Sequence, residues 1–252
     1  MATGRPARAA TIASPSIAAP VNVTAIGFDA DDTLWHNERF FALTQERFGA
    51  LLADYAEPEH LAERLLAAER RNLHRYGYGI KGFVLSMIET AIEVTEDRVP
   101  ARVIRQILDE GHEMLTHPIE LLPNAQAAVE ALAASHHRLI LITKGDLLDQ
   151  ERKLAQSGLG DHFDRIEIVS EKAPEVYARI FTEHGDGPER AMMVGNSLKS
   201  DIHPALEAGA WAVHVPFEIT WALEVADRPD DHARFRTLPD LGGLIALVAE
   251  LG

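Results

Sequence analysis

The segment Val21–Leu34, VNVTAIGFDADDTL, decides the fold, because a buried strand and a cluster of carboxylates meet within it. The apolar and β-branched run Val21–Phe28 predicts a strand buried in a sheet. Three carboxylates follow that strand at once: Asp29, Asp31 and Asp32. In open parallel sheets, functional side chains gather beyond the carboxyl ends of the strands. The segment therefore predicts both the first strand of such a sheet and one part of its functional site.

Four later segments share the pattern of a short apolar run that ends in polar or turn residues. They are Arg138–Ile142, Ile166–Val169, Ala191–Val194 and Ala212–Val215. Helical patterns separate them, over Leu147–Ser157, Glu175–Glu183 and Asp201–Ala208. Gly158 and Gly209 stand where helix C-caps are expected. Strands that alternate with helices form parallel βαβ units, so we expect an α/β protein with a parallel sheet.

Residues 37–117 have a different pattern, which is helical almost throughout. The clearest helical stretches are Leu61–Glu69, Phe83–Glu93 and Ala101–Leu115. We therefore expect an all-α domain of residues 37–117, inserted into a core of residues 21–36 and 118–252. Residues 1–20 lack acids and are rich in Ala, Ser and Pro, which predicts a disordered tail, with a transit peptide as the alternative.

The composition excludes several classes of function. The 252 residues carry a formal net charge of −15, which repels nucleic acid and anionic membranes. No apolar run reaches the ~20 residues of a membrane span. The chain has no cysteine, which excludes disulfides and thiol catalysis, and its histidines show no HxxxH spacing. We expect a cytoplasmic protein with no nucleic-acid or membrane partner, and the sequence leaves its oligomeric state open.

Polar side chains that suit phosphoryl transfer follow four of the predicted strands. They are Asp29 and Asp31 after the first, Thr143 and Lys144 after the second, Lys172 after the third, and Asn196 and Asp201 after the fourth. A carboxylate such as Asp29 can attack a phosphoryl group and form an aspartyl-phosphate. A second carboxyl, Asp31, can protonate the leaving oxygen and later activate water. Asp32 is interpreted as a cap or turn residue just past the strand.

The later strand ends supply groups that bind phosphate and a metal ion. Thr143 can donate a hydrogen bond to a phosphoryl oxygen, and Lys172 supplies a fixed positive charge where transition-state charge spreads. Lys144 either contacts the phosphate or is a solvated lysine. Magnesium takes oxygen ligands and offsets the repulsion between an anionic nucleophile and an anionic phosphate. The sequence therefore predicts a Mg²⁺-dependent site for phosphoryl transfer.

The four motifs together resemble those of the haloacid dehalogenase superfamily of phosphatases. They are FDADDTL at 28–34, LITKGD at 141–146, SEKAPEVY at 170–177 and VGNSLKSD at 194–201. The resemblance implies a Rossmann-like core with an inserted helical cap. It implies that Asp29 is the nucleophile and that Asp31 is both the acid/base and a metal ligand through its backbone carbonyl. It also implies that Thr143 and Lys172 bind the phosphate.

The fourth motif departs from the pattern that it resembles. In the family, acidic residues of this motif hold magnesium, whereas this chain has Asn196 at the first such position and keeps Asp201 at the second. An asparagine oxygen can still coordinate a metal. We therefore expect a metal site formed by Asp29, the Asp31 carbonyl, Asn196 and Asp201.

One stretch of the insert, RNLHRYGYGIK at 71–81, places two glycines among aromatic and cationic side chains. This pattern indicates a loop that faces a ligand, and a solvated connection between helices is the alternative. We take three residues as candidates for substrate specificity: Tyr76, Tyr78 and Lys81. The tryptophans are interpreted as packing residues: Trp35, Trp211 and Trp221.

We therefore expect a magnesium-dependent phosphohydrolase that acts on a small phosphorylated metabolite. A hydrolytic dehalogenase of the same fold does not need the acid at Asp31, because halide leaves without protonation. A phosphomutase needs further cap residues that we do not identify. A phospho-accepting signalling module is much shorter and lacks the insert. A non-catalytic binding protein would not need an intact Asp29, although Asn196 is compatible with it.

Overall fold

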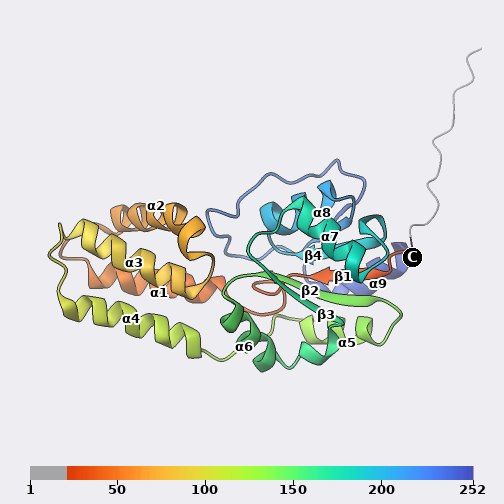
Figure 1. Cartoon of the computed structure of the whole chain (residues 1–252), viewed down its shortest axis with the longest axis horizontal. Helices are drawn as coiled ribbons and strands as arrows, with labels where there is room; N and C mark the ends of the chain where they lie inside the picture. The colour runs from red at the N-terminus through yellow and green to blue at the C-terminus, as the bar shows by residue number, and fades with distance from the viewer. Residues whose placement is uncertain (1–21, 252) are drawn as a thin grey trace, which may run out of the picture.

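The predicted strands lie together in one sheet, which forms the centre of an α/β core (Figure 1). The computed structural model describes residues 22–251. The strands are β1 (Ala25–Phe28), β2 (Arg138–Lys144), β3 (Arg165–Val169), β4 (Ala191–Gly195), β5 (Trp211–His214) and β6 (Phe235–Thr237). Their order is β3-β2-β1-β4-β5-β6, and every pairing is parallel. The expected parallel α/β fold is therefore confirmed.

The register of the sheet brings the motif residues to one edge. Phe28, the last residue of β1, pairs with Leu141 of β2 and Val194 of β4. The residues that follow these three positions therefore emerge side by side beyond the carboxyl ends of the central strands. This edge is where open parallel sheets bind their ligands.

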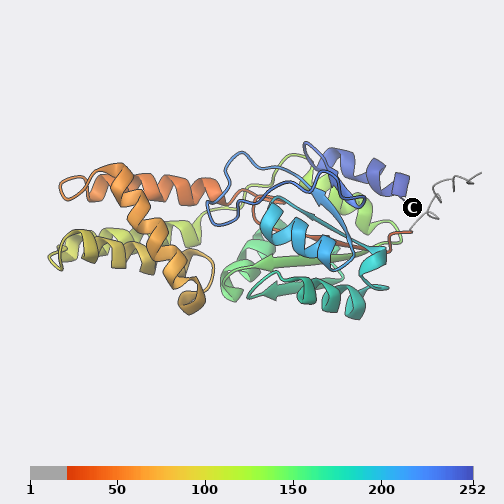
Figure 2. The ribbon, with the colours of Figure 1, turned by 90° about the horizontal axis from the view of Figure 1, so that it is seen from above.

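Helices cover both faces of the sheet (Figure 2), so the central strands β1 and β4 are buried along their whole length. They are α5 (Ala125–Ala133), α6 (Leu147–Ser157), α7 (Pro174–His184), α8 (His203–Glu207) and α9 (Leu244–Leu251). Ile26 and Phe28 of β1 pack in one apolar cluster with residues of α5 and α9. Ala25 packs in the cluster on the other face, with residues of α7 and α8. The core is thus a three-layer, Rossmann-like arrangement.

An all-α insert separates β1 from α5 in the sequence. Its helices are α1 (Glu38–Leu51), α2 (Pro58–Tyr76), α3 (Ile80–Val94) and α4 (Ala101–Thr116). They lie together to one side of the sheet in Figures 1 and 2 and have an apolar cluster of their own, which includes Phe48, Leu65 and Ile107. Because these helices bury apolar side chains against one another, the insert is built as a packed unit.

Several local expectations need correction. The sequence pattern missed α5 and the short strand β6, whereas α1 lies within the region expected to be helical. The helix expected over Asp201–Ala208 instead follows a π-turn at Leu198–Ile202, which places Asp201 before the regular helix. Gly158 has a positive φ of 72° at the end of α6, as the C-cap prediction required. The tail expected at residues 1–20 lies outside the described residues. Within residues 22–251, no helix is both long and apolar enough to cross a membrane.

Candidate active site

Asp29, Lys172 and Asp201 form a buried ion-pair cluster at the edge of the sheet. The Asp29 backbone N–H donates to the Val194 carbonyl at 2.9 Å, which extends the pairing of β1 with β4 by one residue. The Lys172 ammonium donates to Asp201 Oδ1 at 2.7 Å and also to Asp29 Oδ1. The side chains of Lys172 and Asp201 are 2% and 1% exposed. The fold thus joins motif residues that lie more than 170 positions apart along the chain.

The charges in this cluster do not balance, because two buried carboxylates share one ammonium. Burial, together with the neighbouring Asp201 carboxylate, raises the pKa of Asp29 to about 7, although Lys172 lowers it. The pKa of Lys172 lies above its ordinary value because the attraction of both carboxylates outweighs the effect of burial. A further cation at this position would therefore stabilise the ionised form of Asp29.

The loop after β4 holds Asp201 against the strand end. A Cβ on Gly195 would lie 2.3 Å from Asp201 Oδ2, so only glycine permits this approach. The Ser197 N–H donates to Asp201 Oδ2 at 2.9 Å, and Ser197 Oγ accepts from the Ser200 N–H at 3.0 Å. These contacts explain why the sequence GNSLKSD folds back on itself and aims Asp201 at Lys172.

Asn196 lies beside Asp29, as the sequence predicted for a metal ligand. Thr33 Oγ1 is 3.3 Å from Asp29 Oδ2 and 3.3 Å from Asn196 Oδ1, so the hydroxyl bridges the two oxygens. His214 Nε2 lies 3.0 Å from the Asn196 carbonyl oxygen and fixes the backbone there.

The donor set at this edge consists of oxygens only. Among residues 22–251, no group of three or more histidine or acidic side chains forms a metal cluster. Two carboxylates and an amide oxygen nevertheless match the few protein ligands that Mg²⁺ uses beside water and phosphate. The excess of buried negative charge fits the same ion, so the residues present are compatible with magnesium.

Asp31 is anchored by three residues that the sequence analysis did not single out as its partners. Its carboxylate accepts hydrogen bonds from Trp35 Nε1 at 2.7 Å, Gln150 Nε2 at 2.8 Å and Lys153 Nζ at 2.9 Å. Lys153 also donates to Asn37 Oδ1 at 2.8 Å. Trp35 is fully buried, as expected of a packing residue, and it orients Asp31 as well. The spacing of Gln150 and Lys153 within α6 places both on one face of that helix, which is the signal that could have revealed them.

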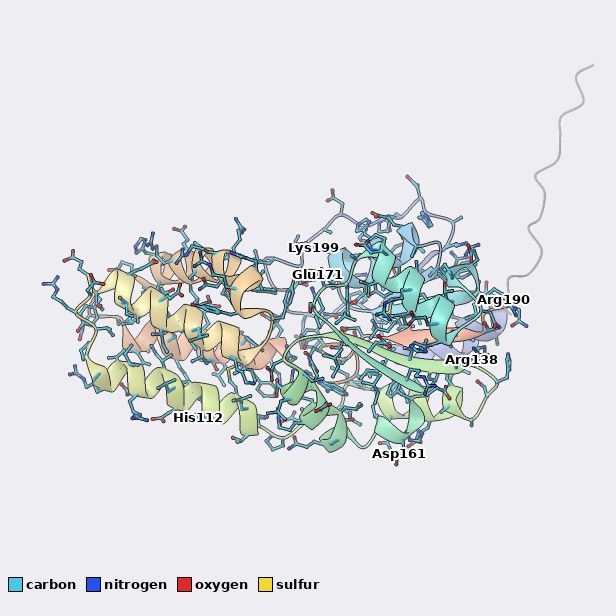
Figure 3. The ribbon with its side chains drawn as sticks, in the orientation of Figure 1. His112, Arg138, Asp161, Glu171, Arg190 and Lys199 are labelled. Atoms are coloured by element: carbon cyan, nitrogen blue, oxygen red, sulfur yellow. The ribbon has the colours of Figure 1, made fainter. Side chains whose placement is uncertain are left out.

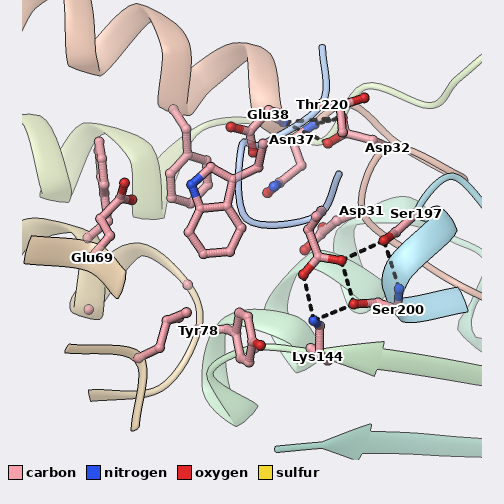
Figure 4. Close-up of a pocket in the computed structure, with 18 of the residues that line it drawn as sticks. Asp31, Asp32, Asn37, Glu38, Glu69, Tyr78, Lys144, Ser197, Ser200 and Thr220 are labelled. Atoms are coloured by element: carbon pink, nitrogen blue, oxygen red, sulfur yellow. Dashed lines mark hydrogen bonds and ion pairs between the residues drawn. The ribbon is translucent and has the colours of Figure 1, made fainter. Parts of the chain in front are cut away.

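Thr143 and Lys144 lie at the end of β2, next to the same cluster. Thr143 is buried and lines the cavity above the strand ends. Lys144 is not a solvated lysine: its ammonium donates to Ser200 Oγ at 2.7 Å and to Glu224 Oε1 at 2.8 Å. It also lies 4.0 Å from the centre of the Tyr78 ring. Figure 4 shows Lys144 beside Ser200 and Tyr78 at the wall of the cavity.

Asp32 has the capping role that the sequence predicted. Its carboxylate accepts from the Asn37 N–H at 2.8 Å and from the Glu38 N–H at 2.9 Å, which are the first donors of α1. Its φ of 59° turns the chain sharply after β1. Asp32 therefore joins the sheet to the insert, and its carboxylate is already committed to the backbone.

A cavity of about 510 Å³ lies above the strand ends, between the core and the insert. The core side contributes the groups described above. The insert side combines apolar side chains, such as Phe41, Leu66 and Phe83, with polar ones such as Glu38 and Glu69. Trp221, which we expected to be a packing residue only, lines the cavity from the loop after β5. The motif residues thus form the floor of an open cavity of the size that small ligands use.

The candidates for substrate specificity divide into two groups. Tyr78 lines the cavity, and its hydroxyl donates to Glu171 Oε2 at 2.8 Å. Tyr76 and Lys81 do not line it. Tyr76 donates to Glu89 on the insert at 2.9 Å, and Lys81 Nζ is 2.9 Å from both carboxylate oxygens of Asp146 on the core. Glu171 lies where the insert meets the core in Figure 3, so Tyr78 and Lys81 both connect the two parts.

Comparison with known proteins identifies the family. The profile of haloacid dehalogenase-like hydrolases matches residues 23–209. A haloacid dehalogenase-like hydrolase from Xanthomonas campestris is 46% identical, with a TM-score of 0.80, over 91% of this chain and 92% of that one. A glyceraldehyde 3-phosphate phosphatase from Methanothermobacter thermautotrophicus is 28% identical over 79% of this chain and 88% of the relative.

Other solved structures share the fold at lower identity. The HAD hydrolase YfnB from Bacillus subtilis, bound to magnesium, is 16% identical with a TM-score of 0.63, over 90% of this chain and 99% of that one. L-2-haloacid dehalogenase from Xanthobacter autotrophicus is 17% identical with a TM-score of 0.60, over 91% of this chain and all of that one. The fold is that of a Rossmann-like α/β protein, and the chain belongs to the haloacid dehalogenase-like hydrolases.

Proposed function

We propose that this chain is a magnesium-dependent phosphohydrolase that acts on a small phosphorylated metabolite through an aspartyl-phosphate intermediate. The observation that supports it most is the cluster of Asp29, Lys172 and Asp201 at the floor of the cavity, with Asp31 two residues beyond Asp29. This arrangement supplies a nucleophile, a fixed positive charge and a separate acid within one chamber.

In the first step, Asp29 attacks the phosphorus atom of the substrate. The bond from phosphorus to the alcohol oxygen breaks as the bond to the carboxylate oxygen forms, and Asp31 gives its proton to the departing oxygen. In the second step, Asp31 takes a proton from a water molecule, which attacks the aspartyl-phosphate. Inorganic phosphate and free Asp29 result, and Asp31 is protonated for the next cycle.

Three further groups stabilise the phosphoryl oxygens in this proposal. Lys172 lies against Asp29 and bears a permanent positive charge. Thr143 offers a hydroxyl at the adjacent strand end. Lys144 is a second cation of the cavity wall, although Glu224 and Ser200 hold it in place. Fixed donors of this kind favour the transition state, in which negative charge spreads over the phosphoryl group.

Asp29, Asn196, Asp201 and the Asp31 carbonyl would hold the magnesium ion. When bound, the ion supplies positive charge that lets two anionic groups, the carboxylate and the phosphate, approach each other. The imbalance of charge in the cluster supports this assignment, since Lys172 alone neutralises only one of the two carboxylates.

We propose that residues 37–117 act as a cap over the site. The insert forms one wall of the cavity, and a wall that closes over the substrate excludes water from the first step. Fold alone does not identify the substrate, because specificity is set by the residues of such a wall.

The choice of phosphohydrolase over dehalogenase is supported by Asp31. A halide leaves without a proton, whereas an alcohol oxygen needs one, and Asp31 is a second carboxyl two residues beyond Asp29 that can supply it. The name of the relative from M. thermautotrophicus says that it is a phosphatase, whereas the dehalogenase from X. autotrophicus is similar in fold only. We find no cap residue that favours a phosphomutase.

The test is hydrolysis of a panel of small phosphate esters with and without magnesium, beside the Asp29→Asn protein as control. We expect phosphate release that requires magnesium and a loss of at least about 10³-fold in Asp29→Asn, whose amide is no nucleophile. Circular dichroism should show that the variant is folded. Normal turnover by the folded Asp29→Asn protein would overturn the assignment of the nucleophile.

A further inference from the structure

The segment at 215–234, between β5 and β6, forms part of the cavity wall without folding into a helix or a strand. It contributes Ile219, Thr220, Trp221, Ala222 and Glu224 to the lining. Our sequence analysis assigned no role to Glu224, whose side chain is only 15% exposed. A carboxylate that is covered to this extent requires compensating partners, because burial of a charge is costly.

The Glu224 carboxylate accepts hydrogen bonds from three donors that belong to two different strand ends. Its Oε1 accepts from the Lys144 ammonium at 2.8 Å, at the end of β2. Its Oε2 accepts from the Ser197 hydroxyl at 2.5 Å and from the Ser200 hydroxyl, both in the turn after β4. Figure 4 shows the bonds that meet around Lys144, Ser197 and Ser200. Glu224 thus ties the end of β2 to the turn that carries two of the proposed metal ligands.

Both serine hydroxyls depend on Glu224 as their acceptor. Ser197 Oγ accepts from the Ser200 N–H at 3.0 Å and gives its own proton to Glu224. Ser200 Oγ accepts from the Lys144 ammonium at 2.7 Å and also donates to Glu224. Each hydroxyl has a single proton to donate, so a loss of this carboxylate would leave both without their acceptor. A buried polar network is rigid when every member of it is paired, as here.

Glu224 is held in its ionised form by these partners. Burial raises its pKa, but the charge of Lys144 and the hydrogen bonds outweigh burial, so the pKa lies below its ordinary value. The Lys144 side chain, which is 11% exposed, balances the negative charge. The pair therefore adds no net charge to the cavity, and its contribution is to hold other groups in place.

The turn after β4 has an unusual backbone that these bonds support. Leu198–Ile202 forms a π-turn, in which the N–H groups of Asp201 and Ile202 donate to the Ser197 carbonyl at 2.9 and 3.1 Å. Turns of this kind are rare and occur frequently at functional sites. The Ser197 N–H also donates to Asp201 Oδ2 at 2.9 Å. Ser197 therefore links two carboxylates, because its hydroxyl binds Glu224 and its amide binds Asp201.

Other contacts already hold the segment at 215–234 on the core. The Lys199 ammonium donates to the Leu223 carbonyl at 2.6 Å, and His203 Nε2 lies 2.7 Å from the Asp227 carbonyl oxygen. Neither Lys199 nor His203 lines the cavity. These contacts lie on both sides of Glu224 in the sequence, so a buried carboxylate is not needed as a simple anchor of the segment.

We propose that Glu224 is a positioning residue for magnesium binding. Through Ser197 and Ser200, it holds the turn at 196–201 in the arrangement that binds the ion, and Lys144 supplies its counter-charge. Glu224 does not contact the ion itself. This inference rests on the metal site of the proposed function. Removal of a partner that orients a metal ligand typically weakens metal binding about 10- to 100-fold.

The test is calorimetric titration of magnesium into the substrate-free protein. Glu224→Gln keeps the size of the side chain but not its charge, and we expect it to raise the dissociation constant about 10-fold. Ser197→Ala removes one hydroxyl through which Glu224 acts and should also raise it, so it is the second variant if the first folds poorly. Lys199→Met loosens the same segment from outside the cavity and is the matched control, which should leave the constant unchanged.

A double variant separates positioning from an effect of charge alone. Glu224→Gln leaves Lys144 without its counter-ion, and this free positive charge would itself repel magnesium. Lys144→Met in the same protein removes that charge but does not restore the acceptor of the two serines. We expect the double variant to keep most of the loss in affinity. Recovery of the original affinity would overturn the positioning role and leave an effect of charge only.

Two other results would also overturn it: an unchanged constant in folded Glu224→Gln, or an equal rise in Lys199→Met. The panel of phosphate esters tests the proposed function separately. Magnesium-dependent hydrolysis with an affinity that does not depend on Glu224 would sink this inference and leave the phosphohydrolase intact. An affinity that depends on Glu224, without turnover of any ester, would do the reverse. Absence of magnesium binding in every protein would overturn both.

Discussion

The two walls of the cavity differ in how completely their polar groups are paired. On the core wall, Lys153 meets Asp31 at 2.9 Å and Lys144 meets Glu224 at 2.8 Å, so both cations are held in fixed positions. On the insert wall, Glu38 and Glu69 have no cation near them. Two cations of the core wall are therefore held in place by carboxylates of the core, whereas these two carboxylates of the insert wall have no ion pair.

This difference suits the separate tasks that we assign to the two walls. Groups that stabilise a transition state are most effective when they are already in place and need no rearrangement. Groups that select a substrate gain from being unsatisfied without it, because the correct ligand then relieves the cost of their burial. A change to the core wall should therefore slow the chemical step, whereas a change to the insert wall should alter the preference among substrates.

The largest effect is expected on the core wall, at Asp31. Asp31→Asn keeps the shape of the side chain but removes the proton that the leaving oxygen needs. We expect hydrolysis of alkyl phosphates to fall about 10²- to 10⁴-fold, and hydrolysis of aryl phosphates to fall less, because a phenolate leaves without full protonation. The measurement is kcat/KM for both ester classes in both proteins. Equal losses would remove the acid role from Asp31.

A smaller effect is expected at Lys153, whose ammonium holds the Asp31 carboxylate in place. Lys153→Met removes the ammonium that holds the carboxylate and Asn37. We expect kcat for alkyl esters to fall about 10-fold with little change in KM, since a misplaced acid slows the chemistry but not the binding. Lys153→Arg should recover part of the loss. A change in KM alone would indicate that Lys153 binds the substrate instead.

Much of the core wall could be predicted from sequence because each of its motifs follows a strand. The register of a parallel sheet brings strand ends together, and the structure does place Asp29, Lys172 and Asp201 in contact, while their roles stay predictions. The missed strand β6 has only three residues and lies at the edge of the sheet, where a short run carries little hydrophobic pattern. The missed helix α5 is short and rich in alanine, which left no clear polar face.

The insert wall was harder to predict because no strand end marks it. The aromatic and cationic side chains at 71–81 predicted Tyr76, Tyr78 and Lys81 as residues that contact the substrate. Of these three, only Tyr78 lines the cavity. Glu38 and Glu69 come from different helices, and their meeting depends on how α1 and α2 cross. An acid on a helix surface is ordinary in a sequence. It becomes informative only when the structure places it beside a cavity without a cation.

The next largest effect is expected on magnesium binding at the core wall. Asp201→Asn removes a carboxylate from the set, and we expect the dissociation constant for magnesium to rise about 10- to 100-fold. Asn196→Asp adds a charge beside Asp29, so it should tighten magnesium binding. Calorimetric titration of magnesium without substrate measures both directly, and magnesium activation at fixed substrate provides a second curve. Circular dichroism should verify that Asp201→Asn, which also unpairs Lys172, remains folded.

The two metal variants separate the assignments of their residues. If Asn196→Asp leaves magnesium affinity unchanged, Asn196 does not contact the ion and Asp201 alone represents its motif. If Asp201→Asn is also silent, the proposed metal site is misplaced. Neither outcome would affect the insert wall, so the two walls can be tested independently.

The smallest effect is expected at Lys81, which joins the two walls from outside the cavity. Its ammonium lies 2.9 Å from the Asp146 carboxylate, which caps α6, and both side chains are partly exposed. Exposed pairs of this kind contribute about 0.2–1 kcal/mol, so Lys81→Ala should change activity by no more than about 5-fold. Because Lys81 does not line the cavity, we expect the same change for alkyl and aryl esters. Higher salt should reduce the difference between the variant and the original protein, since salt screens exposed charges. A change confined to one class of ester would show instead that Lys81 selects the substrate. Substrate selection would then involve the segment at 71–81 as well as the insert wall of the cavity.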